Sequence, residues 1–291
     1  MEDLSSRSKR VGGKRFAALA VLLFVSQLGL AQVQIESDPA SSPETAELVL
    51  QVQNALAAAP PDIGALSVRV TVGLEAFEAA LAADDRRPIV AAYLTSSEFE
   101  AAVAGRPRAN ITAVFSNPDP RDQAALARAL LGRATLAAFD SAATHHLVEL
   151  LGQSANPISA SKDQKIDSLL RAADSFDAVL ALPDSNLLNR SNINHVVRTL
   201  YGRRKVLIGY SVTLTRVGAL ASVYVSPEAI ARSVVDVLVG YARSGNLASP
   251  AFVPEIDVIV NDRLARSLNI AVPEHAELLN AVRSRRSEGA P

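Results

Sequence analysis

Polar side chains follow most of the apolar segments in this chain, at the points where the strands of a parallel sheet would end. Hydroxyl, amide and carboxylate groups of this kind bind small organic ligands through hydrogen bonds and ion pairs. Open α/β sheets bind their ligands just beyond the carboxyl ends of the strands. The candidate residues that share this position are Ser37, Asp38, Thr95, Ser96, Ser97, Ser116, Asn117, Asp140, Ser141, Asp184, Ser185, Tyr210 and Ser211.

Two of these groups have the arrangement of a carboxylate-binding site. Thr95–Ser97 and Asp140–Ser141 each stand before an expected helix, and the free N–H groups of a helix N-terminus attract anions. The carboxylate of Asp184 would in turn bind an amine of the ligand. The alternative is that these residues only cap their helices. For each single residue we favour capping, and for the whole set we favour a ligand-binding cleft.

The chain carries no recognisable catalytic motif. It lacks G-x-S-x-G, the P-loop and a G-x-G-x-x-G that follows a strand. His145 and His146 are adjacent, so on a helix they point about a third of a turn apart and chelate one metal poorly. We expect them at a partly exposed helix end, His195 in a surface or capping role, and His275 in solvent. The sequence therefore predicts no enzyme activity, no metal and no cofactor.

The composition excludes several classes of function. The chain has 291 residues, 49% apolar and 20% charged, which is enough to bury a large core in one or two domains. Because 29 Lys and Arg are balanced by 30 Asp and Glu and the arginines are scattered, no nucleic-acid-binding surface is indicated. Because there is no cysteine, disulfides, thiolate chemistry and Cys-ligated zinc are excluded.

The first 31 residues have the pattern of a secretory signal peptide. Basic residues between 9 and 15 precede an apolar run over 16–30, and small residues precede a cleavage point after Ala31. The alternative is an uncleaved anchor or a disordered tail, but the run is shorter than the ~20 apolar residues that span a bilayer. No cysteine is available for a lipid anchor. We therefore expect a periplasmic protein without stable membrane insertion after cleavage.

Apolar segments of strand length alternate with amphipathic segments of helix length along the rest of the chain. This alternation is typical of an α/β fold with parallel sheets. The expected strands are 33–37, 66–72, 89–94, 111–115, 134–139, 157–159, 178–182, 206–209, 219–225 and 256–260. The expected helices are 43–59, 74–83, 98–103, 121–131, 142–151, 163–173, 193–201, 228–242, 262–268 and 274–282.

Three segments are interpreted as crossings between two lobes. The segment 116–120 has two prolines in three residues, which continue neither a helix nor a central strand. The alternative is an ordinary loop before the next helix. The other crossings are expected at 211–218 and 244–250. The predicted fold class is α/β, with two Rossmann-like lobes whose parallel sheets are joined by a multi-strand hinge. We expect lobe 1 to comprise 32–116 plus 217–250, and lobe 2 to comprise 117–216 plus 251–291.

Four strings in this chain carry a resemblance to a known family. They are ALPD followed by NR (181–190), VLIGYS (206–211), RVGALASVYVSPE (216–228) and VIVNDRLARSLNIAVPE (258–274). In order and spacing they resemble the substrate-binding proteins of bacterial ABC importers, from about Ile111 to the end of the chain. The resemblance implies the type I periplasmic-binding fold, which agrees with the three crossings. It also places Asp184, Asn189, Ser211 and Gly218 within recurring strings, so these rank first as ligand contacts.

The resemblance implies a solute-binding protein that delivers a small organic solute, such as an amino acid, to an inner-membrane ABC permease. A second hypothesis keeps the fold and makes the protein a sensing or partner-binding subunit for a sensor kinase or an outer-membrane receptor. A third hypothesis is a secreted α/β enzyme, which needs a nucleophile and base or paired carboxylates that the sequence does not show. The few aromatic residues, 4% of the chain, disfavour stacking on an aromatic ligand.

Overall fold

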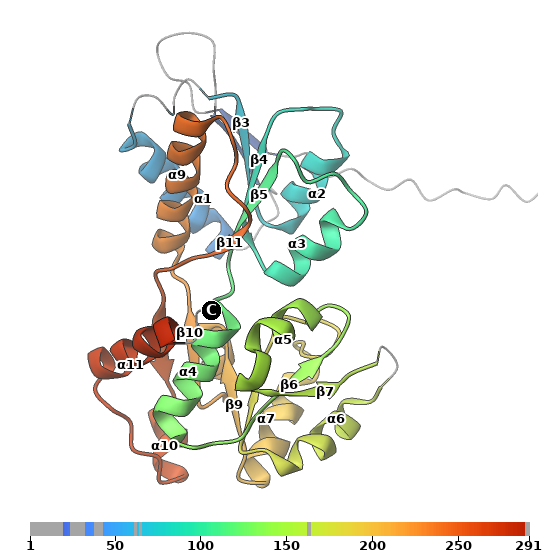
Figure 1. Cartoon of the computed structure of the whole chain (residues 1–291), viewed down its shortest axis with the longest axis vertical. Helices are drawn as coiled ribbons and strands as arrows, with labels where there is room; N and C mark the ends of the chain where they lie inside the picture. Colours follow the sequence, from blue (N-terminus) through green and yellow to red (C-terminus); the bar gives the residue numbers. More distant parts are fainter. Residues whose placement is uncertain are drawn as a thin grey trace, which may run out of the picture.

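The protein consists of two α/β lobes stacked end to end (Figure 1). This computed structural model describes residues 20–23, 33–37, 43–60, 63, 66–161 and 164–288. Each lobe is built on one sheet of six strands that is mostly parallel, with helices on both faces. The predicted fold class is therefore confirmed.

Lobe 1 is built on the sheet β1-β2-β3-β4-β5-β11, in which only β1 runs antiparallel to its neighbour. Four of the predicted strands are found here, and those at 33–37, 89–94 and 111–115 have the predicted bounds. The elements of the lobe are β1 Ala20–Leu23, β2 Val33–Ser37, α1 Pro43–Ala57, β3 Val68–Val72, α2 Leu74–Ala82, β4 Ile89–Leu94, α3 Ser96–Val103, β5 Ile111–Phe115, α9 Pro227–Ser244 and β11 Ala251–Phe252.

Alternate strand residues of lobe 1 bury opposite faces of its sheet. Val70 and Val90 belong to the core under α1 and α9, whereas Ala91 and Ala113 belong to the core under α2 and α3. This is the period-two pattern of a strand that is covered on both sides. Phe99 of α3 lies in the second core, where its ring packs against the rings of Phe77 and Phe115.

The connection β2–α1–β3 has the opposite hand from the two connections that follow it. All three move one strand along the sheet in the same direction, but α1 covers one face and α2 and α3 cover the other. Connections between parallel strands are almost always right-handed. The first connection of lobe 1 is therefore the exception, in the part of the chain that lies outside the family resemblance.

Lobe 2 is built on the sheet β12-β10-β9-β8-β6-β7, in which β12 alone runs antiparallel. Helices α4, α5 and α11 cover one face of this sheet, and α6, α7 and α8 cover the other. The elements of the lobe are α4 Pro120–Leu131, β6 Leu136–Asp140, α5 His145–Leu151, β7 Asn156–Ser159, α6 Ile166–Ala172, β8 Ala178–Leu180, α7 Ile193–Gly202, β9 Val206–Gly209, α8 Val212–Val217, β10 Ala221–Tyr224, β12 Asp257–Val260, α10 Asp262–Ser267 and α11 His275–Glu288.

The chain crosses three times between the lobes, always at the carboxyl ends of strands. The first crossing, 116–119, leads from β5 to α4 in the predicted proline-rich segment, where Asp119 caps α4. The second crossing, 225–226, leads from β10 to α9, and the third, 253–256, leads from β11 to β12.

Two of the expected crossings, and the lobe boundaries drawn from them, differ from the structure. Ser211 accepts a hydrogen bond from the N–H of Leu214 and begins the short helix α8, so the chain stays in lobe 2 at 211–218. Strand β10 then pairs with β9 and β12 of lobe 2. After 244–250 the chain remains in lobe 1, because β11 pairs with the carboxyl end of β5 before the chain crosses.

Strand β1 lies within the segment that the sequence predicts to be a signal peptide. Its four residues pair antiparallel with β2, from Ala20 opposite Ser37 to Leu23 opposite Gln34. The predicted cleavage point after Ala31 lies outside the described residues. Removal of the leader would therefore leave β2 as the edge strand of lobe 1.

A buried ion pair holds β2 and β3 together beneath α2. Glu36 and Arg69 are 1% and 4% exposed, and the guanidinium donates two hydrogen bonds to the carboxylate, at 2.6 and 2.7 Å. Arg69 Nη1 also donates to the carbonyl oxygen of Ala80 at the end of α2, at 3.2 Å. The hydrogen bonds to Glu36 raise the pKa of Arg69, so the guanidinium is charged at neutral pH.

We expect the substitution Arg69→Met to lower the free energy of unfolding by about 3–5 kcal/mol, because it leaves the Glu36 carboxylate buried and unpaired. The double variant Glu36→Leu/Arg69→Met should lose far less, because neither charge remains. Urea unfolding of the three proteins measures the difference. The exposed pair Arg108–Glu100 is the control, and Arg108→Ala should cost less than about 1 kcal/mol. Equal losses in the single and double variants would contradict the argument.

Candidate functional site

The carboxyl ends of the two sheets face each other where the lobes meet (Figure 1). His146 Nε2 of α5 lies 3.2 Å from Ser96 Oγ of α3, so the two lobes are in contact at this point. The carboxylate of Glu98 in lobe 1 is close enough to Tyr210 in lobe 2 to influence its pKa. We call this region the lobe junction, and its residues are Thr95, Ser96, Ser97, Glu98, Ser116, Asn117, Asp140, Ser141, His146, Asp184, Tyr210 and Ser211.

Three N–H groups at the start of α3, where a carboxylate was predicted to bind, already have acceptors. The Glu98 carboxylate accepts from the Thr95 N–H at 2.7 Å, and Thr95 Oγ1 accepts from the Glu98 N–H at 3.2 Å, which makes a capping box. The side-chain oxygen of Asn117 accepts from the Ser96 N–H at 2.8 Å. The Ser97 hydroxyl is buried and has no hydrogen-bond partner among the described residues. Thr95 and Asn117 therefore position α3 beside the junction.

Strand β4 reaches the junction through a β-bulge at Tyr93. This residue has φ of 59°, in the left-handed region, and the register of β4 against β5 shifts between Ala92 and Leu94. Ala92 and Tyr93 both pack on the α1 and α9 side, and Leu94 returns to the other face. Backbone strain of this kind clusters at functional sites. The bulge thus marks the end of β4, directly before Thr95, as a candidate site.

In lobe 2 the carboxylate of Asp184 organises the junction. One oxygen accepts from the Ser141 hydroxyl at 2.6 Å, and the other accepts from the backbone N–H of Asn186 at 2.8 Å. The Thr144 hydroxyl links the same turn to the end of β6, because it accepts from the Ser141 N–H and donates to the Phe139 carbonyl. Asp184 and Ser141 were predicted at separate strand ends, and the structure brings them into direct contact.

Tyr210 lies between the two lobes at the end of β9. Burial, together with the nearby carboxylates of Glu98 and Asp184, raises the pKa of its phenol to about 12. The phenol is therefore protonated at neutral pH and available as a hydrogen-bond donor. Its surroundings at the junction carry negative charge from both lobes.

Glu98 and His146 are the two junction residues that were not among the predicted site residues. Both histidines lie in the first turn of α5, at the partly exposed helix end that was expected, and the exposed imidazole of His145 hydrogen-bonds Asp140. His146 instead is half-buried against α3 of the other lobe. Burial lowers the pKa of His146, whereas the hydrogen bond to Asp140 raises the pKa of His145. No local pattern distinguishes the two, because the difference arises from the second lobe.

Two of the four residues ranked first by resemblance have local structural roles. Asn189 forms a turn in which its side-chain oxygen accepts from Ser191 and its amide donates to the Ser185 carbonyl. Gly218 ends α8 with φ of 120°, and a Cβ at this position would lie 2.6 Å from a methyl carbon of Val197. Gly218 also lines a cavity with residues of α7 and α10, near the amino end of β10 and away from the lobe junction.

Three of the remaining predicted site residues lie at or directly after the ends of their strands. Ser211 caps α8 beside Tyr210, and Asp140 holds His145 at the end of β6. Ser37 is buried at the end of β2, and Asp38 lies outside the described residues. Among the residues that the structure describes, no group of three or more His, Asp or Glu side chains is arranged to bind a metal ion.

Comparisons with known proteins show which fold this is. Neither a protein-family model nor a curated protein matches the chain. Many solved structures are similar, and three of them have identities of 13–20%. One, described as a conserved domain protein from Vibrio cholerae, has 20% identity and a TM-score of 0.53, with 80% of this chain and 82% of that chain covered.

The second structure is an ABC domain from Streptococcus pneumonia in complex with L-Trp, with 18% identity, a TM-score of 0.56, and coverage of 83% and 95%. The third is a ligand-free, open substrate-binding protein with adhesive properties from Clostridium difficile, with 13% identity, a TM-score of 0.54, and coverage of 80% and 81%. At these identities the likeness establishes the fold alone.

We expect His146→Gln to remove part of the pH dependence of folding stability. The pKa of His146 is lower in the folded protein than its ordinary value of 6.5, so protonation favours unfolding. Its contribution to the free energy of unfolding is complete above pH 6.5 and is lost as the pH falls through the folded-state pKa. Urea unfolding between about pH 5 and 8 measures this.

The adjacent His145 provides the control for this experiment. Its pKa is raised, so its contribution is complete below pH 6.5 and is lost as the pH rises through the folded-state pKa. His145→Gln should therefore change the pH profile in the opposite sense to His146→Gln. Identical profiles for the wild type and His146→Gln would show that His146 is not buried at the junction.

Proposed function

Because the chain has the two-lobed fold of type I periplasmic binding proteins, we propose that it is a periplasmic solute-binding protein of an ABC-type importer. The observation that carries this proposal is the contact between Ser96 and His146, which joins the carboxyl ends of the two sheets. Ligands of open α/β sheets bind at that edge. Two such edges that face each other provide polar groups on both sides of one small molecule.

The charges at the junction indicate which solutes fit. Glu98 and Asp184 flank Tyr210, and Glu100 lies close enough to His146 to influence its pKa. The Arg121 guanidinium, at the adjacent crossing, is occupied by Asp119 at 2.7 Å. An amine therefore finds carboxylate acceptors, whereas a free carboxylate meets negative charge and an α3 N-terminus that Glu98 already caps. We propose an organic solute with an amine, and the charge of the junction favours an amine without a carboxylate over an amino acid.

Solute entry would require the lobes to separate, because residues of both lobes touch at the junction. The three crossings are short, and each lies next to a strand end, so rotation about them moves one lobe as a body. Arg232 of α9 and Glu255 of the third crossing form an exposed ion pair at 2.6 Å beside this hinge. Closure on a solute would bring His146 back to α3 and present one continuous surface to a permease.

The periplasmic location and the permease are further parts of this proposal. The leader-like pattern of residues 1–31 supports export, and the absence of cysteine leaves no site for a lipid anchor. None of the helices in the described ranges has the length and apolar character to cross a bilayer. An ABC domain and a substrate-binding protein among the similar structures support the transport role.

We expect purified protein to be stabilised by amine-bearing solutes in a thermal-shift screen that also contains carboxylic acids, sugars and nucleosides. A solute at about 100 times its dissociation constant adds roughly 2.7 kcal/mol of stability. Glu98→Gln should keep the capping box, since Gln also serves there, and should weaken binding of the best solute roughly tenfold. The matched control is Glu47→Gln, an exposed carboxylate on α1.

Closure is measured on the same protein with two fluorophores. The chain has no cysteine, so Leu50→Cys on α1 and Tyr201→Cys on α7, at positions 54% and 46% exposed, label one site on each lobe. The best solute should change the energy transfer between the labels. The proposal for the junction would be overturned if no solute stabilised the protein. It would also be overturned if neither Glu98→Gln nor Asp184→Asn changed the affinity for the best solute.

A further inference from the structure

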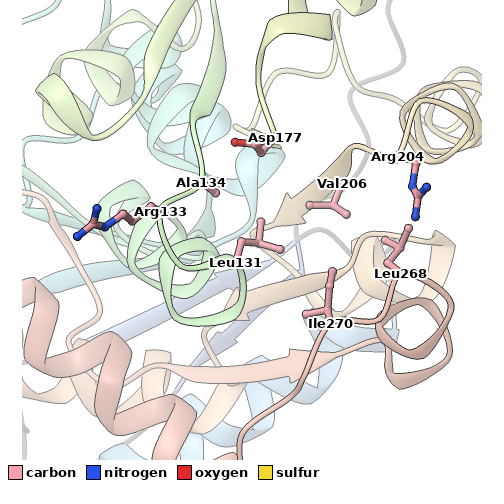
Figure 2. Close-up of a pocket in the computed structure, with 8 residues that line it drawn as sticks. All are labelled: Leu131, Arg133, Ala134, Asp177, Arg204, Val206, Leu268 and Ile270. Carbon is pink, nitrogen blue, oxygen red and sulfur yellow. The ribbon is translucent and has the colours of Figure 1, made fainter.

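A second cavity lies at the end of lobe 2 that is opposite the lobe junction (Figure 2). Its volume is about 450 Å³, within the range of small-molecule sites. It is formed by the end of α4, the amino ends of β6, β8 and β9, and the segment after α10. It is therefore separated from the junction by the length of the strands.

The lining combines an apolar surface with two free cations. Leu131, Val206 and Ile270 provide the apolar part, and Arg133 and Arg204 lie at opposite ends of the cavity in Figure 2. Both arginines are exposed, and neither forms an ion pair with any residue that the structure describes. Such a lining fits a molecule with an apolar body and a negatively charged group.

The acidic residue in the lining already has hydrogen-bond donors within the protein. The Asp177 carboxylate accepts from the Thr135 N–H at 2.7 Å and from the Thr135 hydroxyl at 2.8 Å. These two hydrogen bonds hold it against the start of β6, and Lys205 next to it carries the opposite charge. The net charge around the cavity is therefore positive.

The backbone at Arg204 gives independent support for a role of its side chain. Arg204 follows the end of α7 with φ of 58°, in the left-handed region. Glycine is the usual residue at this position after a helix, because other residues are strained there by roughly 1–2 kcal/mol. An arginine is thus held in a strained conformation at the rim of a cavity, and this strain is typical of binding sites.

We infer that this cavity binds a small organic anion with an apolar body, and that Arg204 binds its anionic group. The apolar body would lie on Leu131, Val206 and Ile270. The second cation, Arg133, adds long-range attraction from the far end of the cavity. This inference does not depend on the proposed solute-binding function, since the two sites share no residue.

The probe for this site is octanoate, with octanol as the neutral molecule of equal chain length. Calorimetric titration of the purified protein should show binding of octanoate that exceeds binding of octanol by roughly tenfold or more. Arg204→Gly should reduce octanoate binding to the level of octanol. The same substitution should leave the melting temperature unchanged or raise it by about 2 °C, because it relieves the backbone strain.

The matched control is Asn269→Gly, which relieves a second left-handed residue, φ 56°, at the end of α10 without removing a cation. It should leave octanoate binding intact. Unchanged octanoate binding in Arg204→Gly would overturn the inference. So would equal affinity for octanoate and octanol, or binding only to phosphatidylglycerol vesicles, which would assign the arginines to a membrane surface and not to a small molecule.

Discussion

The parallel strands of each sheet all end at one edge, and this constraint determines where the polar contacts between the lobes lie. Each of the three crossings leaves its lobe from such an edge, so the two edges are forced to face each other. Residues far apart in the sequence, such as Ser96, Ser141 and Asp184, consequently lie around one junction. The hydrophobic cores lie farther along the strands and serve to hold these edges in place.

The sequence predicts the elements better than their assignment to a lobe. Strand bounds at 89–94, 111–115 and 206–209 agree with the structure, because short apolar runs between turn residues are a strong local signal. Strand β10 was assigned to the wrong lobe, since its own residues fit either sheet and only pairing with β9 and β12 decides. Gly218 was expected at the site because it lies in one of the strings that resemble the family. Its packing against Val197 of α7 could not be predicted, because it depends on how two separate segments of the chain fold together.

The architecture also sorts charge between the two ends of lobe 2. Helices start at the carboxyl edge of the sheet and finish at the opposite end, so their dipoles favour acids at the junction and bases at the far end. Asp119 and Asp140 stand before α4 and α5, and Arg133 and Arg204 follow α4 and α7. This accounts for the presence of bases near the second cavity. It does not account for the strained backbone of Arg204, since a base one residue earlier would complement the dipole without strain.

The polar groups at the junction are of two kinds: some form hydrogen bonds within their own lobe, and others form them across the two lobes. Glu98 and Asp184 are tied to their own lobes, by Thr95 and by Ser141 and Asn186, so opening of the lobes leaves their charges in place. Ser96 and His146 are bonded across the lobes, so opening frees them. A proposed solute would then meet fixed carboxylates in either state, whereas His146 and Ser96 would be available to it only while the lobes are open. If the protein binds a solute as proposed, the fold of each lobe would set the charge preference of the site, and the few groups bonded across the lobes would set its closure.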